Sequence, residues 1–238
     1  MSIRNLFTIL VNKRRNYLLL DLSRQLDLFS LYTQYRYADE ANYIAAQTGK
    51  TRRRLSLFMR TSGSIFWSHQ KNVEKISDYL KFCFPSKSVS GLCMGSRSGE
   101  EQELFTKNLP GSVIFGVELE ASANLIKDTI IGDFHNLSQI PNSSQDFVYS
   151  NSHDQSNSFF KAITEWLRLL KSGGLLVLEH SRAHGKLRVG RQDPCGIESE
   201  ILPFLLMMGF QNQITLECIL TPAVQFEDFH LIFIFKKI

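Results

Sequence analysis

Apolar residues along the chain follow two spacings, and the change from one to the other predicts its elements. From His69 onward, short apolar runs alternate with stretches in which apolar residues recur every three or four positions. Short bounded runs are typical of buried strands, and the wider spacing is typical of helices with one buried face. The runs predict strands at 89–93, 113–117, 129–131, 146–149 and 175–178.

Helical spacing lies between these strands. We predict helices at 69–82, 99–107 and 159–170 and a short helical turn at 121–127, with the glycines of 171–174 ending the 159–170 helix. Alternating strands and helices indicate a parallel sheet with right-handed crossovers. The last two apolar runs, 213–219 and 229–235, have no helical pattern between them and are predicted to pair antiparallel at one edge. The pattern therefore predicts an α/β fold with a seven-stranded, mostly parallel sheet.

Residues 1–68 show helical spacing without a motif. Leucines recur mostly at three- and four-residue steps at positions 18, 19, 22, 26, 28 and 31. We predict an N-terminal helical appendage at 1–68 and the main domain at 69–238. The tyrosines of this region (Tyr32, Tyr35, Tyr37 and Tyr43) either line a lid over a substrate or pack the appendage onto the core, and we favour packing.

Composition excludes several classes of protein. The 238 residues are 43% hydrophobic and 21% charged, which is ordinary for a soluble globule, and the net charge of +4 does not indicate a nucleic-acid partner. The basic triplet Arg52-Arg53-Arg54 is interpreted as a solvated helix face rather than an RNA contact.

Four cysteines stand far apart without a C-x-x-C pair, which favours a reduced compartment and predicts no metal site. The apolar run 6–11 precedes a basic cluster, in the reverse order to a signal peptide, and is too short to span a bilayer. We expect a cytoplasmic protein without a membrane partner.

The most informative stretch is 89–101, where an apolar run stops at Gly95, passes through small and polar residues to Gly99 and then turns acidic. This is the pattern of a buried strand that ends in a tight turn and enters a helix. Gly95 lets a ligand approach the main chain, and the first N–H groups of the following helix face the cleft beyond the strand. We interpret the turn as the floor of a cofactor site.

Polar residues also end the next strands, namely Glu118, Asp133 and Ser150-Asn151. In an open parallel sheet, ligands bind beyond the carboxyl ends of the strands. Glu118 there suits the two hydroxyls of a ribose, and Asp133 suits an exocyclic adenine amine. Two acids at successive strand ends beside a glycine turn favour a nucleotide site over solvated surface acids.

The motifs of 89–178 together resemble a class I S-adenosylmethionine-dependent methyltransferase, closest to the generic type 11 group. The turn Cys93-x-Gly95-x-Arg97-x-Gly99 with Glu101 resembles the first family motif, and 116–118, 132–137, 144–151 and 166–174 resemble those that follow. The resemblance implies a Rossmann-like fold and S-adenosylmethionine as cofactor. The cofactor-binding residues that it implies are Cys93, Gly95, Ser96, Arg97, Gly99, Glu101, Glu118, Leu119, Asp133, Phe134, His135 and Asn151.

Two positions depart from the family pattern. Cys93 replaces the usual acidic residue of the first motif, and Arg97 replaces its central glycine. We expect Arg97 either to lie along the methionine carboxylate or to pair with Glu101 and shape the turn.

The resemblance implies methyl transfer to an unidentified acceptor, for which we expect a small molecule. His153 is the candidate general base, with Asp154 and His180 as further candidates, and 181–197 is a candidate flap. A nicotinamide oxidoreductase is disfavoured because G-x-G-x-x-G is missing. An RNA or protein methyltransferase is less favoured because Asn151-Ser152-His153-Asp154 lacks the Asn/Asp-Pro-Pro-aromatic tetrad of amino-methylating enzymes. A binding or scaffold protein that kept the fold and lost the chemistry remains an alternative.

Overall fold

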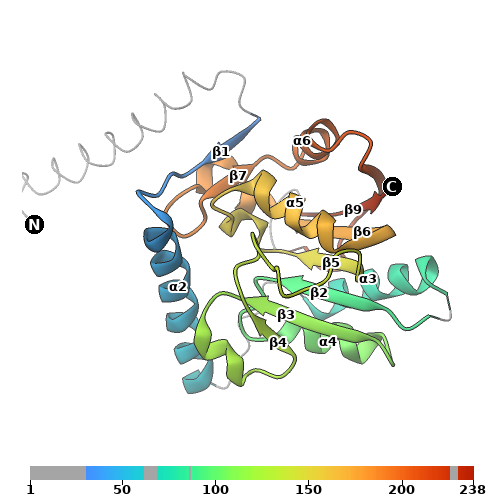
Figure 1. Cartoon of the computed structure of the whole chain (residues 1–238), viewed down its shortest axis with the longest axis horizontal. Helices are drawn as coiled ribbons and strands as arrows, with labels where there is room; N and C mark the ends of the chain where they lie inside the picture. The colour runs from blue at the N-terminus through green and yellow to red at the C-terminus, as the bar shows by residue number, and fades with distance from the viewer. Residues whose placement is uncertain (1–30, 62–68, 86, 226–229) are drawn as a thin grey trace, which may run out of the picture.

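The computed structural model describes residues 31–61, 69–85, 87–225 and 230–238. A seven-stranded sheet forms the middle of the molecule (Figure 1). The strand order is β4-β3-β2-β5-β6-β9-β8. Its strands are β2 (Ser90–Met94), β3 (Val113–Glu118), β4 (Thr129–Ile131), β5 (Gln145–Ser150), β6 (Leu170–His180), β8 (Ile214–Leu220) and β9 (Leu231–Lys237).

Six of these strands run in one direction, β8 included, and only β9 runs in the opposite one. β4, β3, β2, β5 and β6 run in one direction, and β9 is antiparallel to both β6 and β8. The predicted α/β fold, a mostly parallel sheet with an antiparallel C-terminal strand pair, is confirmed. All parallel strands therefore present their carboxyl ends at one edge, where the candidate site residues follow them.

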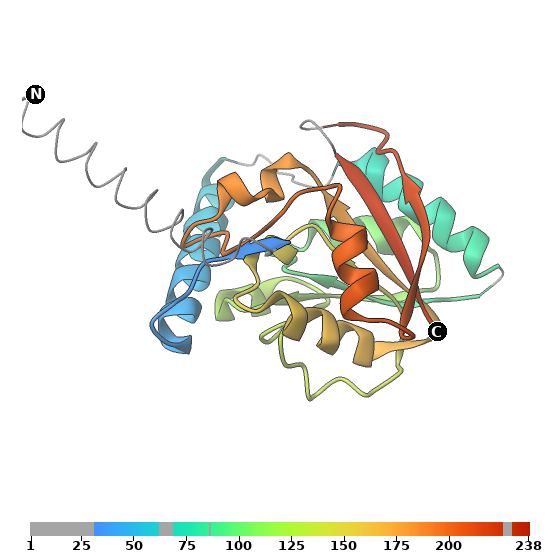
Figure 2. The ribbon, with the colours of Figure 1, turned by 90° about the horizontal axis from the view of Figure 1, so that it is seen from above.

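Helices cover both faces of the sheet, each over its own apolar cluster (Figure 2). α3 (Gln70–Cys83) and α4 (Glu100–Asn108) pack on one face, and α5 (Phe159–Leu169) and α6 (Leu202–Gly209) pack on the other. α5 follows the three- and four-residue spacing of a one-sided helix and buries Trp166 fully. α6 was not predicted, because its sequence is apolar nearly all round and shows no stripe.

The N-terminal part contributes a strand and a helix. β1 (Tyr32–Gln34) pairs antiparallel with β7 (Cys195–Ile197), and α2 (Glu40–Thr61) lies at the carboxyl-end side of β3 (Figure 1). β1 is a departure from a purely helical appendage, and its partner lies more than 150 residues away. The leucines at positions 18–28 lie outside the described residues, and the domain division at residue 68 stays a prediction.

The predicted glycine cap at the end of the 159–170 helix was wrong. α5 ends at Leu169 and β6 begins at Leu170, so Gly173 does not cap the helix. Gly173, with φ 77°, instead lies where the β5–β6 register shifts between Gln145 and Phe147. The turn after β3 is the 3₁₀ helix η1 (Ala121–Leu125). The predicted flap holds two more 3₁₀ helices, η3 (Arg182–His184) and η4 (Lys186–Arg188), besides β7.

Candidate functional site

The glycine turn after β2 is held against β3 by its own backbone. Gly95 has φ 76°, and the N–H groups of Gly95 and Ser96 both donate to the Val117 carbonyl, at 2.9 and 3.1 Å. A Cβ on Gly95 would lie 2.8 Å from the Cβ of Ser152, which follows β5. Gly99, with φ 82°, then begins α4. Glycine is therefore required at Gly95 both by the left-handed backbone and by the close approach of the next loop.

Glu118 closes this turn onto the end of β3. Its Oε1 accepts from the backbone N–H groups of Leu119 (2.8 Å) and Glu120 (3.1 Å), and its Oε2 accepts from the N–H of Arg97 at 3.0 Å. Burial raises the pKa of Glu118, although these donors and the Arg97 charge act in the opposite direction. Because a carboxylate oxygen can accept two hydrogen bonds, Oε2 retains capacity for a ligand hydroxyl beside the Arg97 N–H.

Asp133 is fixed by the residues that follow it. Its Oδ1 accepts from the backbone N–H of His135 at 2.9 Å and lies 2.5 Å from Nδ1 of the same residue, whose Nε2 is 2.8 Å from Ser156 Oγ. Burial opposes ionisation of Asp133, but the bonds and charge of His135 prevail and lower its pKa. Phe134 points into the core, where its ring contacts Trp166 edge-on at 5.5 Å. The loop therefore holds the Asp133 carboxylate in a fixed orientation.

Helix α2 reaches both acids, which the sequence analysis missed. Tyr43 lies edge-on to the His135 ring at 5.6 Å between centroids, and Thr51 Oγ1 is 3.4 Å from Glu118 Oε1. Burial raises the pKa of Tyr43, and the charges of Asp133 and Glu118 raise it further. Within residues 40–53 of α2, the part whose side chains the structure describes, the buried positions at helical spacing are Tyr43, Ala46, Gln47, Lys50 and Thr51. Since three of these five are polar, hydrophobic periodicity gave no sign of a buried face.

The remaining residues of the first motif divide between site and core. Ser96 Oγ and Arg97 Nε are buried without a hydrogen-bond partner, and Arg97 has φ 45°. Glu101 accepts from Asn151 Nδ2 at 3.4 Å, and burial raises its pKa to about 7. Cys93 instead lies in the apolar cluster beneath α3 and α4, where burial raises the pKa of its thiol. Its side chain therefore lies in that cluster, near the charge of Glu101 at the start of α4.

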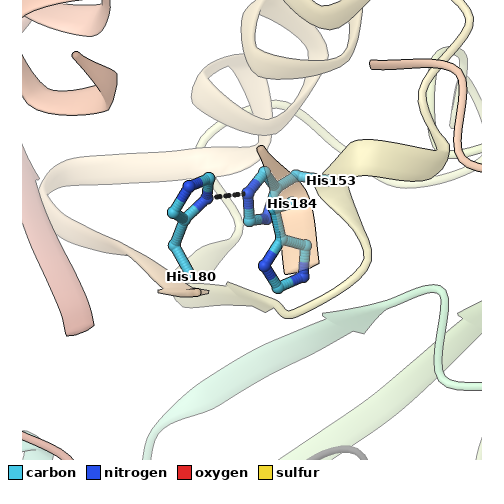
Figure 3. Close-up of side chains that lie close together, drawn as sticks. All are labelled: His153, His180 and His184. Atoms are coloured by element: carbon cyan, nitrogen blue, oxygen red, sulfur yellow. Dashed lines mark hydrogen bonds between the residues drawn. The ribbon is translucent and has the colours of Figure 1, made fainter. Parts of the chain in front are cut away.

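The other candidate residues gather beyond β5 and β6. His153, in the 3₁₀ helix η2 (His153–Gln155), has Nε2 2.7 Å from His180 Nδ1, and His184 packs against both rings (Figure 3). Burial, and then the charges of the neighbouring histidines, lower the pKa of His153 and of His180 well below the usual value. Asp154 is also buried, and its Oδ1 has no partner.

The strand-end edge thus holds two groups of residues, which we name by their contents. The carboxylate half comprises the glycine turn 95–99 with Glu118 and Asp133. The histidine half comprises His153, His180 and His184. Asn151 joins them, because its side chain contacts Glu101 and its carbonyl lies 3.0 Å from His184 Nε2. A surface hollow lined by Leu80, Phe84, Val89 and Leu109, among others, lies at the opposite, amino ends of the strands.

No family model and no curated protein matches the sequence. Among the described residues, no helix has the length and apolar character needed to cross a bilayer.

Solved structures do match the fold. The 1,6-didemethyltoxoflavin-N1-methyltransferase of Burkholderia thailandensis, solved with S-adenosylhomocysteine, is 14% identical with a TM-score of 0.60 over 85% of this chain and 92% of that one. The plantazolicin methyltransferase BamL is 14% identical, with a TM-score of 0.57 over 83% and 96%. The [4+2]-cyclase SpnF is 13% identical, with a TM-score of 0.54 over 79% and 77%. The chain has the class I, Rossmann-like fold of S-adenosylmethionine-dependent methyltransferases.

Proposed function

We propose that the protein transfers a methyl group from S-adenosylmethionine to a small-molecule acceptor. The observation that carries the proposal is the left-handed glycine turn closed by Glu118, with Asp133 following the neighbouring strand at the same sheet edge. The likeness to two methyltransferases named for small-molecule acceptors supports it.

The carboxylate half suits this cofactor chemically. Glu118 has a free acceptor position for a ribose hydroxyl, and Asp133 has an oxygen beyond the one that His135 uses. Arg97 Nε and Ser96 Oγ are buried polar atoms without partners at the turn, where they suit the methionine carboxylate. The bound cofactor would supply the electrophilic methyl group. The chain's own part is to align the acceptor and exclude water, with Tyr43 and Thr51 of α2 closing the side next to the acids.

His153 is the proposed base for an acceptor that carries a proton. Its ring is neutral at pH 7, because burial lowers its pKa, and it lies beyond the strand that Asn151 follows. The flap 181–197 and the N-terminal appendage are the segments proposed to select the acceptor.

Calorimetry with S-adenosylhomocysteine tests the proposal. In Glu118→Gln, one oxygen can still accept from the backbone, but the charge that strengthens a ribose bond is lost. We expect affinity to fall roughly 10- to 100-fold, the equivalent of one hydrogen bond to a charged group. Glu103→Gln on the exposed side of α4 is the matched control and should bind as the wild type does. Equal affinity in the Glu118→Gln variant and the wild type would remove Glu118 from the site.

A protein that binds S-adenosylmethionine without transferring its methyl group is the second candidate. Two observations favour it: the Cys93 thiol faces the core, and a neighbour of the same fold is named as a cyclase. Incubation with methyl-tritiated cofactor and a small-molecule extract separates the two. Bound label without labelled product supports the second candidate, and labelled product supports the first.

A further inference from the structure

The three histidines beyond β5 and β6 form a cluster in which only His153 has a proposed part in methyl transfer, as a base, and an ion bound there would take the place of that part. They come from three elements: His153 from η2, His180 from the end of β6 and His184 from η3. Their ring centroids are 4.9–5.0 Å apart, and one ring nitrogen from each lies within 4.8 Å of the other two (Figure 3). Three imidazole nitrogens this close can ligate a single ion.

Backbone carbonyls orient two of the rings. His180 Nε2 lies 3.0 Å from the Ile197 carbonyl, and His184 Nε2 lies 3.0 Å from the Asn151 carbonyl. A carbonyl can only accept, so each of these nitrogens carries the proton and each Nδ1 is left with a lone pair. Histidines that ligate metals are held in this way, with the second nitrogen donating to a carbonyl or carboxylate.

His153 has an unexplained buried atom. Its Nε2 is 2.7 Å from the His180 lone pair, and its Nδ1 is buried without a partner. In a tetrahedral site with metal–nitrogen bonds of 2.0–2.1 Å, these two ligand nitrogens would stand about 3.3 Å apart. A shift of roughly 0.6 Å, with the His153 proton moved to Nδ1, therefore makes room for an ion.

His184 is the adaptable ligand. Its side chain is only partly buried, and its Nδ1 accepts from the backbone N–H of Ser181 at 2.9 Å, a bond that ligation would replace. The cluster is thereby open to ions on the η3 side. Asp154 follows His153 directly in the chain, and its buried carboxyl has an Oδ1 without a hydrogen-bond partner.

We propose that His153, His180 and His184 bind one divalent transition-metal ion of the zinc class, leaving the fourth position open. Nitrogen ligands select zinc and its neighbours over magnesium and calcium, which prefer oxygen. The proposal does not rest on methyl transfer, because the ligands lie in the histidine half and the ion can be measured without cofactor.

The test is zinc titration of the full chain after treatment with a chelator and dialysis. We expect one ion per chain with roughly micromolar affinity or better by competition with a chromophoric chelator. We also expect a zinc-dependent rise in melting temperature, and visible absorption from four-coordinate Co²⁺. In His180→Gln and His184→Gln, zinc affinity should fall more than about 100-fold, because even losing a group that orients a ligand lowers affinity 10- to 100-fold.

His69→Asn is the matched control, because His69 caps α3, is not one of the three proposed ligands, and asparagine can cap as well. It should bind zinc as the wild type does. Circular dichroism checks that each variant folds, and His184→Gln, with the most exposed of the three side chains, keeps the test valid if His180→Gln does not fold. Zinc binding that is weaker than roughly millimolar, or unchanged in His184→Gln, would overturn the site and leave a hydrogen-bonded histidine pair. S-adenosylhomocysteine binding, measured in parallel, reports separately on the proposed function.

Discussion

The carboxylate half and the histidine half face the same sheet edge but treat their buried acids differently. Asp133 accepts two hydrogen bonds from His135, and its pKa is lowered despite burial. Asp154 has an oxygen with no partner, and burial raises its pKa. Asp133 is held in place by its own loop, whereas Asp154 is buried with one carboxyl oxygen that accepts no hydrogen bond.

Both halves contain buried polar atoms without hydrogen-bond partners, but on different kinds of group. Buried polar groups in folded proteins are nearly always satisfied, so an unsatisfied one indicates a ligand, an ion or stored strain. In the carboxylate half, Glu118 and Asp133 accept hydrogen bonds, and the unpaired atoms are Arg97 Nε and Ser96 Oγ. In the histidine half, the unpaired atoms are His153 Nδ1 and Asp154 Oδ1.

The largest expected effect comes from Gly95→Ala, which tests the rigid carboxylate half. The left-handed backbone and the 2.8 Å contact with Ser152 should together lower the free energy of unfolding by about 2–4 kcal/mol. Gly173→Ala, at φ 77° with nothing within 4 Å of the added Cβ, should lose only about 1 kcal/mol. Gly190→Ala, in open space, is the neutral control. Urea unfolding measures all three, and equal losses at Gly95 and Gly173 would show that the Ser152 contact is unimportant.

The next largest effect is expected when Asp133 and Asp154 are each replaced with asparagine and the free energy of unfolding is measured in chelator-treated protein. The pKa of Asp133 is lower in the folded state than in the unfolded state. Its charge therefore stabilises the fold at pH values above the unfolded-state pKa, and this stabilisation is lost as the pH falls through the folded-state pKa. Asp133→Asn should therefore lose about 1–2 kcal/mol at pH 7 and little near pH 3. Asp154 has a raised pKa, so its charge destabilises the fold as pH rises, and Asp154→Asn should gain about 1 kcal/mol at pH 7. Effects of the same sign would contradict the contrast.

The arrangement of the carboxylate half could be predicted from the sequence because each of its parts follows a strand of the parallel sheet. The turn 95–99, Glu118 and Asp133 each follow a strand, and the parallel order of the strands places them at one edge. Cys93 is the exception, since the alternation of side chains along β2 turns its thiol to the α3–α4 face.

The histidine half and α2 could not be assembled from the sequence. His184 joins His153 through a bend after β6 that has no periodic pattern, so only the folded chain brings the rings together. β1 and β7 pair although they lie far apart in the sequence, and strands of only three residues are too short to produce a clear sequence pattern. The described buried positions of α2 are mostly polar, so the hydrophobic pattern did not predict the contact between this helix and Glu118. Contacts that polar groups make between residues far apart in the chain produce no hydrophobic periodicity in the sequence.

The smallest expected effect belongs to Glu101, which links the halves through its 3.4 Å bond from Asn151. Burial raises its folded-state pKa to about 7, so the folded state holds a proton that the unfolded state has already released between about pH 4.5 and 7. Stability from this group is complete at low pH and declines as pH rises through that range. Glu101→Gln should match the wild type below pH 4.5 and be more stable than it at pH 8, because only the wild type must then ionise a carboxyl whose charge burial disfavours. Urea unfolding at the two pH values measures the difference. A variant no more stable at pH 8 than the wild type would mean that the Asn151 bond, rather than burial, governs Glu101, and that the two halves are coupled through it.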